Sequence, residues 1–242
     1  MDIKKTLQIQ SVLFIILLLS GCLFPKENLS QNQIPYEDQL LSVQQAIDQY
    51  RTDNNGILPI KTKDADTSIF EKYIIDFEQL KQSGFLSTIP ANAFENGGIY
   101  QYVIIDPEQT AEVKLIDLRT TDALRSTFVK LDLYRDKHLY PPFDIEVADG
   151  LYKIDYEKLG LDENPSVTSP FTDNLLPIVM NVHGDLFIDY RKDLMQVLNE
   201  YEHTYVEGDD IRYLLTDHYP FVPAHSLPMT IKNDEPIFIE SE

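Results

Sequence analysis

The chain has 242 residues, with 40 acidic against 20 basic side chains, a formal net charge of −20, and a single cysteine. This excess of negative charge argues against a nucleic-acid partner, whose phosphates need Lys and Arg for neutralisation. One cysteine excludes an intrachain disulfide framework and any multi-cysteine zinc or iron–sulfur site. The length allows one large domain or two to three small ones, and an apolar content of 43% is enough to build a core.

Residues 1–21 predict a secretory signal peptide. Lys4 and Lys5 precede an unbroken apolar run at residues 12–19, and small residues follow it. Eight helical residues rise only about 12 Å, whereas the hydrocarbon core of a bilayer is about 30 Å thick. We therefore expect a cleaved signal rather than a permanent membrane span.

The tetrapeptide Leu19-Ser20-Gly21-Cys22 resembles the bacterial lipobox. The resemblance implies cleavage between Gly21 and Cys22, a diacylglyceryl thioether on Cys22, and an acyl group such as palmitate on its new amine. Stable anchoring needs two acyl chains, because one binds only marginally. The alternative is an ordinary signal peptide with an incidental cysteine. The lipobox predicts a protein anchored at the extracytoplasmic face of the cell membrane, with residues 22–35 as a lipidated, proline-containing tether.

Residues 36–118 predict a helix, an irregular middle and a hairpin. Apolar side chains recur at three- and four-residue steps, which is typical of an amphipathic helix: Tyr36, Leu40, Val43, Ile47 and Tyr50. Asn54-Asn55-Gly56 predicts the end of this helix. Residues 99–105 and 111–118 predict the two strands of a hairpin that turns around Pro107.

Residues 119–190 predict a second unit of the same kind. Thr120, Thr121 or Asp122 is expected to cap its helix. The helix would place four apolar residues on one face: Leu124, Phe128, Leu131 and Tyr134. Residues 176–182 and 185–190 predict its hairpin, with the turn at His183-Gly184.

The two units share sequence landmarks in the same order, which predicts a tandem duplication of helix-plus-hairpin repeats. Ile75–Leu80 (IDFEQL) matches Ile154–Leu159 (IDYEKL), 79 residues later. Further pairs are Tyr50-Arg51-Thr52-Asp53 with Tyr134-Arg135-Asp136, Leu58-Pro59 with Tyr140-Pro141, and Pro90 with Pro170. The predicted fold class is α+β with small antiparallel sheets, and whether the copies share one sheet or form separate domains stays open.

Residues 191–242 predict a C-terminal helix and a small hairpin. The helix would align Leu194, Leu198, Tyr201 and Tyr205, and the hairpin would pair residues 229–232 with 236–239. Element order also allows this segment to be a shortened third copy, although no motif supports that interpretation.

Two family resemblances bear on the fold and the location. The run Tyr50–Pro59 after a helix and before a sheet resembles the globular part of pseudopilins, which implies a fold class only, because pseudopilins retain an apolar N-terminal helix. The lipobox, the acidic body and the run Phe221–Pro228 resemble the YphF-like lipoproteins of Bacillus-type bacteria. That resemblance implies a place at the outer face of a cytoplasmic membrane and brings no catalytic residues.

Three histidines are candidate metal ligands. His203, His218 and His225 fall within 23 residues of one another, near Glu207-Gly208-Asp209-Asp210. No pair has the i,i+4 spacing of a helix face, and the acidic run lacks the alternating ligands of a calcium loop. Turn chemistry explains the acidic run better, so we expect neither a metal nor a cofactor.

No catalytic constellation emerges from the sequence. His225-Ser226 adjacency has no motif value, and a Gly-x-Ser-x-Gly motif is absent. Acidic pairs could suggest glycoside hydrolysis, but those at 76/78 and 155/157 alternate with apolar residues and are expected to face solvent. We expect a protein that is not an enzyme.

Two aromatic–proline runs are the best candidates for a contact surface. They are residues 140–143 and 218–221, and the predicted contact residues are Tyr140, Phe143, Tyr219 and Phe221. Packing in a small core is the alternative role for these rings. The sequence therefore favours an anchored, non-catalytic interaction module with a protein or envelope partner, neutral or basic in charge. A small-ligand or solute-binding lipoprotein is the alternative, followed by an envelope enzyme.

Overall fold

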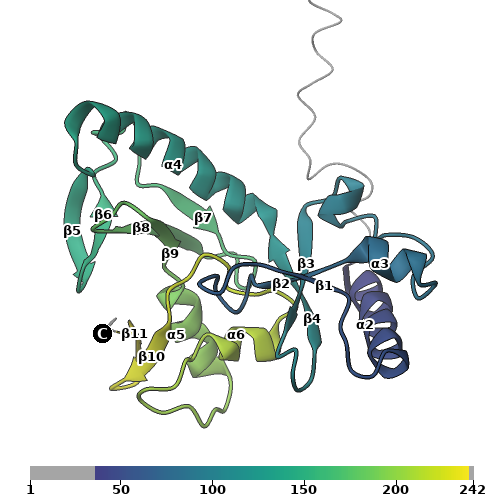
Figure 1. Ribbon diagram of the computed structural model, residues 1–242. Coiled ribbons are helices and arrows are strands. Elements are labelled where there is room, and N and C mark those ends of the chain that lie inside the picture. Colours follow the sequence, from purple (N-terminus) through teal and green to yellow (C-terminus); the bar gives the residue numbers. More distant parts are fainter. Residues whose placement is uncertain (1–35, 240–242) are drawn as a thin grey trace, which may run out of the picture.

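The computed structural model describes residues 36–239, and the first half of this region is a helix packed on a four-stranded antiparallel sheet (Figure 1). The sheet order is β1-β2-β3-β4, and α2 packs against β4. The elements are α2 (Tyr36–Asp53), β1 (Ile60–Thr62), β2 (Tyr73–Ile75), α3 (Phe77–Gln82), the short 3-10 helix η4 (Phe94–Asn96), β3 (Tyr100–Ile105) and β4 (Glu112–Asp117).

The second half builds another antiparallel sheet and a C-terminal hairpin. In this sheet β8 pairs with β6, β7 and β9, and β5 pairs with β6, while α4 lies beside β7 and β9. The elements are α4 (Leu118–His138), β5 (Phe143–Ala148), β6 (Leu151–Ile154), β7 (Ser166–Thr168), β8 (Leu175–Asn181), β9 (Leu186–Ile188), α5 (Arg191–Glu200), α6 (Tyr213–His218), β10 (Met229–Lys232) and β11 (Glu235–Phe238). The α+β fold class with small antiparallel sheets is confirmed.

The two sheets share a strand arrangement. A helix precedes each one, and β1-β2-β3-β4 has the same neighbours in order as β5-β6-β8-β9. The pairing between second and third strands also corresponds, with Ile74 opposite Val103 and Lys153 opposite Val179. β7 is an addition without a counterpart among the named strands of the first sheet.

The matched IDFEQL and IDYEKL segments have the same local geometry. The carboxylates of Asp76 and Asp155 each accept the N–H three residues later, both at 3.2 Å. Their own N–H groups donate to the carbonyls of Pro59 and Pro142, both at 2.8 Å. These correspondences agree with the tandem duplication, which stays a prediction. They pair Pro59 with Pro142 rather than with the expected Pro141.

A strap formed by residues 220–226 joins the two sheets. Leu115 of β4 donates its N–H to the Pro220 carbonyl at 2.9 Å and accepts from the Val222 N–H at 3.0 Å. Ile188 of β9 donates its N–H to the carbonyl of His225 at 2.9 Å. Because β4 and β9 occupy corresponding positions, one segment covers an edge of both sheets.

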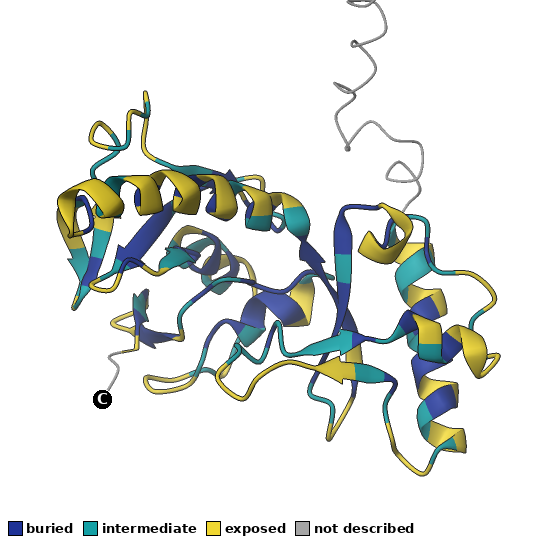
Figure 2. Ribbon diagram, turned by 45° about the horizontal axis from the view of Figure 1, so that its top comes forward, coloured by how far each residue is buried: buried dark blue, intermediate teal, exposed yellow. Residues whose placement is uncertain are grey.

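The main hydrophobic core runs through both halves (Figure 2). Aromatic rings concentrate where the strap enters it. The ring of Phe221 lies 5.4 Å from that of Tyr36, 5.6 Å from Tyr100 and 6.4 Å from Phe171, measured between centroids. The halves therefore pack as one continuous interior in the part of the chain that the structure describes.

Several predicted boundaries need correction. α4 begins at Leu118 and not after Thr120–Asp122, because Asp117 already caps it by accepting the Arg119 N–H at 3.0 Å. Phe128 was expected on the buried face, but it is exposed, and Thr127 takes the interior position. The helix α5 ends at Glu200, so Tyr201 and Tyr205, which were expected to continue its apolar stripe, lie beyond it.

Candidate functional site

A groove lies between the N-terminal half of α4 and residues 161–168, and we call it the α4 groove. It consists of two adjoining pockets of about 420 and 390 Å³, which share Ala123 and Ser166. The other lining residues are Arg119, Thr120, Ser126, Thr127 and Lys130 from the helix, and Leu161, Glu163, Asn164, Pro165, Val167 and Thr168 opposite it.

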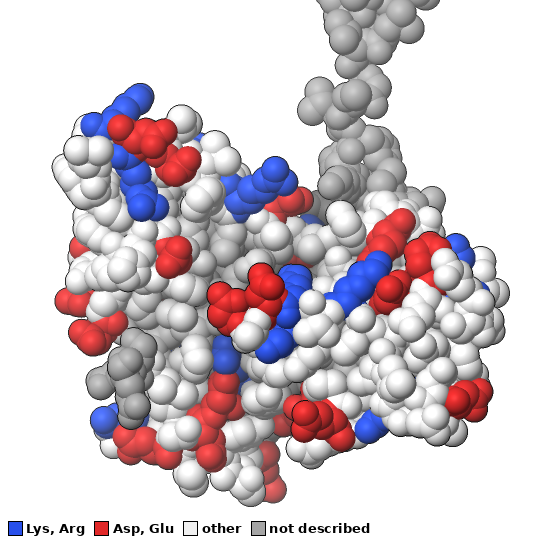
Figure 3. Space-filling model, viewed as in Figure 1, with Lys and Arg blue, Asp and Glu red and all other residues white. Residues whose placement is uncertain are grey.

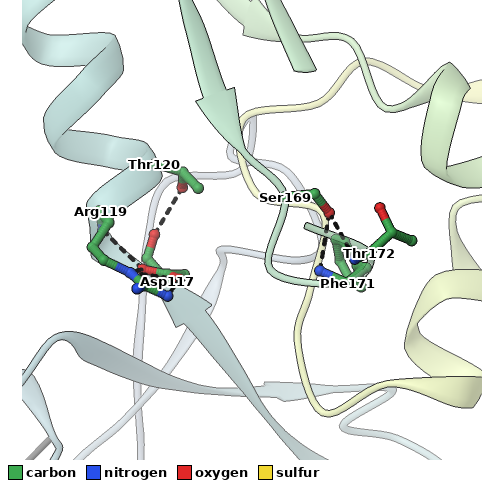
Figure 4. Close-up of polar contacts among 6 residues, drawn as sticks. All are labelled: Asp117, Arg119, Thr120, Ser169, Phe171 and Thr172. Atoms are coloured by element: carbon green, nitrogen blue, oxygen red, sulfur yellow. Dashed lines mark hydrogen bonds and ion pairs between the residues drawn. The ribbon is translucent and has the colours of Figure 1, made fainter. Parts of the chain in front are cut away.

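The helical wall is fixed by the Asp117 cap (Figure 4). The Asp117 carboxylate accepts from Arg119 Nε at 2.9 Å and from Arg119 Nη2 at 2.5 Å, in addition to the Arg119 N–H. The hydroxyl of Thr120 donates to the Asp117 carbonyl at 2.7 Å. These contacts hold the first turn of α4 in one geometry where the strand β4 passes directly into the helix.

The hydroxyls further along the helix are partly satisfied by their own backbone. Ser126 Oγ and Thr127 Oγ1 both donate to the Ala123 carbonyl, at 2.8 and 3.0 Å. A hydroxyl that donates in this way keeps its acceptor lone pairs for another partner. Lys130 and Glu163, both exposed, add a cation and a carboxylate to the lining.

The opposite wall includes an open strand edge. Ile178 of β8 donates to the Pro165 carbonyl at 2.9 Å, so alternate residues of this segment face β8. Because successive residues of a strand direct their backbone groups to opposite edges, those of Ser166 and Thr168 face away from β8. Within residues 36–239, no other strand pairs with β7.

The end of β7 is clamped to α5 through Asp193, which is fully buried. Its carboxylate accepts from Ser169 Oγ at 2.5 Å, Thr172 Oγ1 at 2.5 Å and Asn174 Nδ2 at 3.1 Å. Ser169 Oγ in turn accepts from the N–H groups of Phe171 and Thr172 at 2.9 and 3.2 Å (Figure 4). Both walls of the α4 groove are thus held by capped, hydrogen-bonded turns.

The chemistry of the α4 groove is that of polar recognition. Its lining offers hydroxyls, a side-chain amide, free backbone groups, one amine, the guanidinium of Arg119 and one carboxylate, and includes neither His nor Cys. A more apolar pocket of about 460 Å³ lies elsewhere, between the β5–β6 and β8–β9 turns and the C-terminal hairpin, lined by Leu151, Val182, Phe187, Leu227, Phe238 and Ile239 among others.

The structure does not unite the four predicted contact residues. Tyr140 is 53% exposed at the end of α4, and Phe143 is half-buried beside Tyr152. Tyr219 is half-buried, whereas Phe221 is only 6% exposed. The expectation of an exposed corner at Phe221 is wrong, because the strap carries this ring into the core.

Two of the three candidate histidines, His218 and His225, make separate structural contacts. His225 Nδ1 lies 3.3 Å from the Glu71 carboxylate, and its Nε2 lies 2.9 Å from Thr121 Oγ1, so it links the strap to the loop before β2 and to α4. The ring of His218 stacks on Tyr201 with 3.6 Å between centroids. Among the described residues, no cluster of three or more His, Cys, Asp or Glu is arranged to hold a metal ion.

The acidic run near these histidines behaves as a turn. The Asp209 carboxylate accepts the Val206 N–H at 2.9 Å, and Asp210 pairs with Arg212. Glu207 lies 3.5 Å from Lys232 Nζ. Each of these acidic side chains thus has a partner within the protein.

Sequence reasoning missed a recurrent Asp-x-Arg pair. It occurs at the start of α4, α5 and α6, where the Asp accepts the Arg N–H at 3.0–3.1 Å and Arg Nε at 2.9 Å each time. The pairs are Asp117–Arg119, Asp189–Arg191 and Asp210–Arg212. The repeated strings IDLR, IDYR and DDIR in the sequence would have revealed it.

The chain is thus an α+β protein with two similarly ordered antiparallel sheets, a strap that joins them and a polar groove. Residues 36–117 match the model of the YphF family N-terminal domain, about a third of the chain. The match covers α2 through β4, which is the first structural unit. No curated protein and no solved structure matches the chain.

The predicted signal and anchor lie outside the described residues. This applies to residues 1–21, the tether at 22–35, and both Gly21 and Cys22. Within residues 36–239, no helix combines the length and the apolar content that crossing a membrane requires.

Proposed function

We propose that this chain is a lipid-anchored lipoprotein at the extracytoplasmic face of the cell membrane, whose folded body is a non-catalytic binding module. The observation that carries the proposal is the sequence Leu19-Ser20-Gly21-Cys22, which follows an apolar run and holds the only cysteine. The similarity of residues 36–117 to the YphF family N-terminal domain supports it.

The spacing between anchor and body fits such a role. Residues 22–35 separate Cys22 from the start of α2 at Tyr36. A flexible chain of that length has an end-to-end distance of about 20 Å. The tether would keep the body close to the bilayer.

Replacement of Cys22 tests the anchor. Cys22→Ala removes the thiol that would carry the diacylglyceryl group, so we expect an unprocessed or released protein without label from a palmitate analogue. Ser20→Ala, which keeps a small residue before the cleavage point, is the matched control. Membrane retention of Cys22→Ala at the normal level, with no lipid label on either form, would refute the lipobox interpretation.

Site-specific crosslinking tests the α4 groove as the binding surface. A photoreactive residue at Thr168 is expected to capture a partner in cells, and the same residue at exposed Leu41 on α2 is the control. Ala123 borders both pockets, so Ala123→Trp should abolish capture at Thr168 without unfolding the protein. Equal capture at both positions, or capture that survives Ala123→Trp, would exclude the groove.

A small-ligand receptor is the second candidate, because each pocket of the α4 groove lies within the roughly 300–1,000 Å³ typical of ligand sites. A thermal-shift screen of polar metabolites would then yield a stabilising compound whose effect Ala123→Trp removes. A partner protein without any such compound favours the interaction module.

A further inference from the structure

The outer edge of β7 carries backbone groups that select an extended chain as their partner. Ser166 and Thr168 direct their N–H and C=O groups away from β8. Within residues 36–239, no strand pairs with this edge, and these groups have no backbone hydrogen bond there. An open edge of this kind is a template for one more strand, because only an extended chain matches its alternating donors and acceptors.

The α4 groove has room for a single chain beside this edge. The helix α4 lies next to β7, and the two pockets of about 420 and 390 Å³ lie between them. Paired strands lie about 4.8 Å apart, so one extended chain fits along the groove. The helix stands in the way of a second folded sheet, which would need the space that α4 occupies.

The tether joins the folded body close to one end of the α4 groove. The ring of Tyr36, the first described residue, lies 6.3 Å from that of Tyr100, measured between centroids. Tyr100 is the β3 partner of Asp117 at the end of β4. The Asp117 carboxylate holds the side chain of Arg119, which lines the groove. Residues 22–35 therefore start from the place where the groove begins.

The tether is also long enough to follow the groove. The helical lining runs from Arg119 to Lys130, which is about 17 Å at 1.5 Å per residue. Residues 28–34 span about 23 Å when extended. Pro35 disfavours a helical conformation at Ile34, which favours an extended approach to the groove.

Residues 28–34 match the charge of the groove. Figure 3 shows Lys and Arg side chains along the position of α4 and Asp and Glu side chains elsewhere on the same face. Arg119 and Lys130 line the helical wall and Glu163 the opposite one, so an occupant of either charge would meet a like charge. A quarter of the chain is charged, yet both residues 28–34 (NLSQNQI) and residues 164–169 (NPSVTS) carry no charge. Pairing them buries no unpaired ion.

The side chains of this segment also suit the hydroxyls of the helical wall. Ser126 and Thr127 donate to the Ala123 carbonyl and keep their acceptor lone pairs. The Asn and Gln side chains of residues 28–34 supply N–H donors for such acceptors. Backbone and side-chain chemistry thus point to the same occupant.

We propose that residues 28–34 of this chain pair with Ser166–Thr168 as an added strand, so that the tether itself occupies the α4 groove. Residues 22–27 would remain between the body and the anchor, with a reach of at most about 20 Å. A protein partner at this edge must displace the tether, and that consequence rests on the proposed function. The pairing itself requires no lipid.

Disulfide mapping tests the pairing in the chain from residue 22 onward, with Cys22→Ser so that no other thiol is present. Thr168→Cys is combined in turn with a cysteine at each position from 28 to 34. Alternate residues of a strand point to the same face, so the intramolecular disulfide yield should rise and fall with a two-residue period. Leu41→Cys replaces Thr168→Cys in the control, because Leu41 is exposed on α2 and nearer to the tether in sequence. It reports random encounter, and its yields should be lower and without a period.

Hydrogen exchange tests the backbone bonds. Ser30→Pro combined with Gln31→Pro removes a donor facing β7 in either register, because successive residues direct their N–H groups to opposite edges. Amide exchange at Ser166 and Thr168 should then quicken at least about fivefold, the effect of one net backbone hydrogen bond. Ser30→Ala combined with Gln31→Ala keeps both N–H groups and should leave exchange unchanged.

Disulfide yields without a two-residue period, or no higher than those with Leu41→Cys, would overturn the proposal. Disulfides that form only between two copies would overturn it in favour of a dimer. Exchange that slows only when a partner protein is added would overturn it in favour of that partner. Because these measurements use no lipid, a failed lipobox test with Cys22→Ala leaves their result interpretable by itself.

Discussion

The three Asp-x-Arg pairs provide a stability experiment with internal controls, because their geometry is nearly constant and their burial is not. The Nη2–Oδ2 distances are 2.5 Å for Arg119 and 2.6 Å for Arg191 and Arg212. The exposed fractions of the same arginine side chains are 48%, 31% and 5%. Replacing each arginine by alanine therefore removes the same type of ion pair from three environments of different burial.

Arg212 has the most to lose. Besides the three hydrogen bonds from its side chain to Asp210, its Nη1 donates to the carbonyl and the hydroxyl of Ser226, both at 3.0 Å. Its guanidinium also lies 4.9 Å from the Phe70 ring centroid. Hydrogen bonds to charged groups contribute about 1.5–3 kcal/mol each, and they are not additive. We expect Arg212→Ala to lower the free energy of unfolding by about 4 kcal/mol, because it also leaves a partly buried carboxylate unpaired.

The other two pairs give smaller expected losses in the free energy of unfolding, with which Arg212→Ala is compared. Arg191→Ala should cost about 2 kcal/mol and Arg119→Ala about 1 kcal/mol, because solvent screens these more exposed guanidinium groups. The buried carboxylates of Asp117 and Asp189 keep the backbone N–H groups of residues 119 and 191 as donors. Urea unfolding followed by circular dichroism measures all three. Arg212→Lys should recover little stability, because lysine cannot reproduce the planar, forked donor set. Equal losses at the three sites would refute the argument that burial sets the strength of these pairs.

Three further changes have defined outcomes. Leu139→Gly should raise the free energy of unfolding by about 0.5–1 kcal/mol, because glycine adopts a φ of 64° without strain. Gly98→Ala should lower it by about 3 kcal/mol, because the new Cβ would lie 2.0 Å from the carbonyl carbon of Asn92. Tyr190→Phe should lower it by about 1 kcal/mol below pH 10, through loss of the 3.1 Å hydrogen bond to the Ala224 carbonyl. Burial raises the pKa of Tyr190, so the wild type loses this advantage as the unfolded tyrosine ionises above about pH 10 and the two curves converge.

Matched substitutions check each of these effects in thermal or urea unfolding. Leu133→Gly, in the exposed interior of α4, should destabilise where Leu139→Gly stabilises. Gly160→Ala, with open space around the new Cβ, should cost less than Gly98→Ala. Tyr140→Phe at a half-exposed ring should leave the alkaline transition in place. A stabilising Leu133→Gly, an innocuous Gly98→Ala, or stability curves for Tyr190→Phe that stay parallel above pH 10 would contradict the respective argument.

The elements that the sequence predicted well are those with long periodic patterns. The apolar stripe at Val43, Ile47 and Tyr50 defines α2, and two runs of alternating residues define β3 and β4. The strands β1, β2 and β7 were missed, and each has three residues, too few for a period to show. The helices α3 and α6 were missed as well, with six residues each. The strands β5 and β6 were also missed, although the sequence of β5, FDIEVA, alternates apolar and acidic residues over most of its length.

The candidate site was beyond the reach of sequence patterns for a different reason. The α4 groove exists because α4 packs beside β7, and that contact joins Thr120 and Thr168 across 48 residues of chain. Thr127 shows where the hydrophobic pattern of a helix misleads. Its hydroxyl donates a hydrogen bond to the Ala123 carbonyl, which allows this polar residue to occupy a buried helix position. Hydrophobic periodicity assigned that face to Phe128 instead.

The strap changes how the first unit should be regarded. The family match ends at Asp117, where β4 ends, which suggests a self-contained domain. Yet the outer edge of β4 is paired with residues more than 100 positions later, and buried Lys114 donates to the carbonyls of Thr216 and Tyr219 at 2.6 and 3.2 Å. A strand edge left without such a partner is a site for unwanted pairing with other chains. In this protein the C-terminal segment closes that edge, so the first unit reaches its observed structure as part of the whole chain.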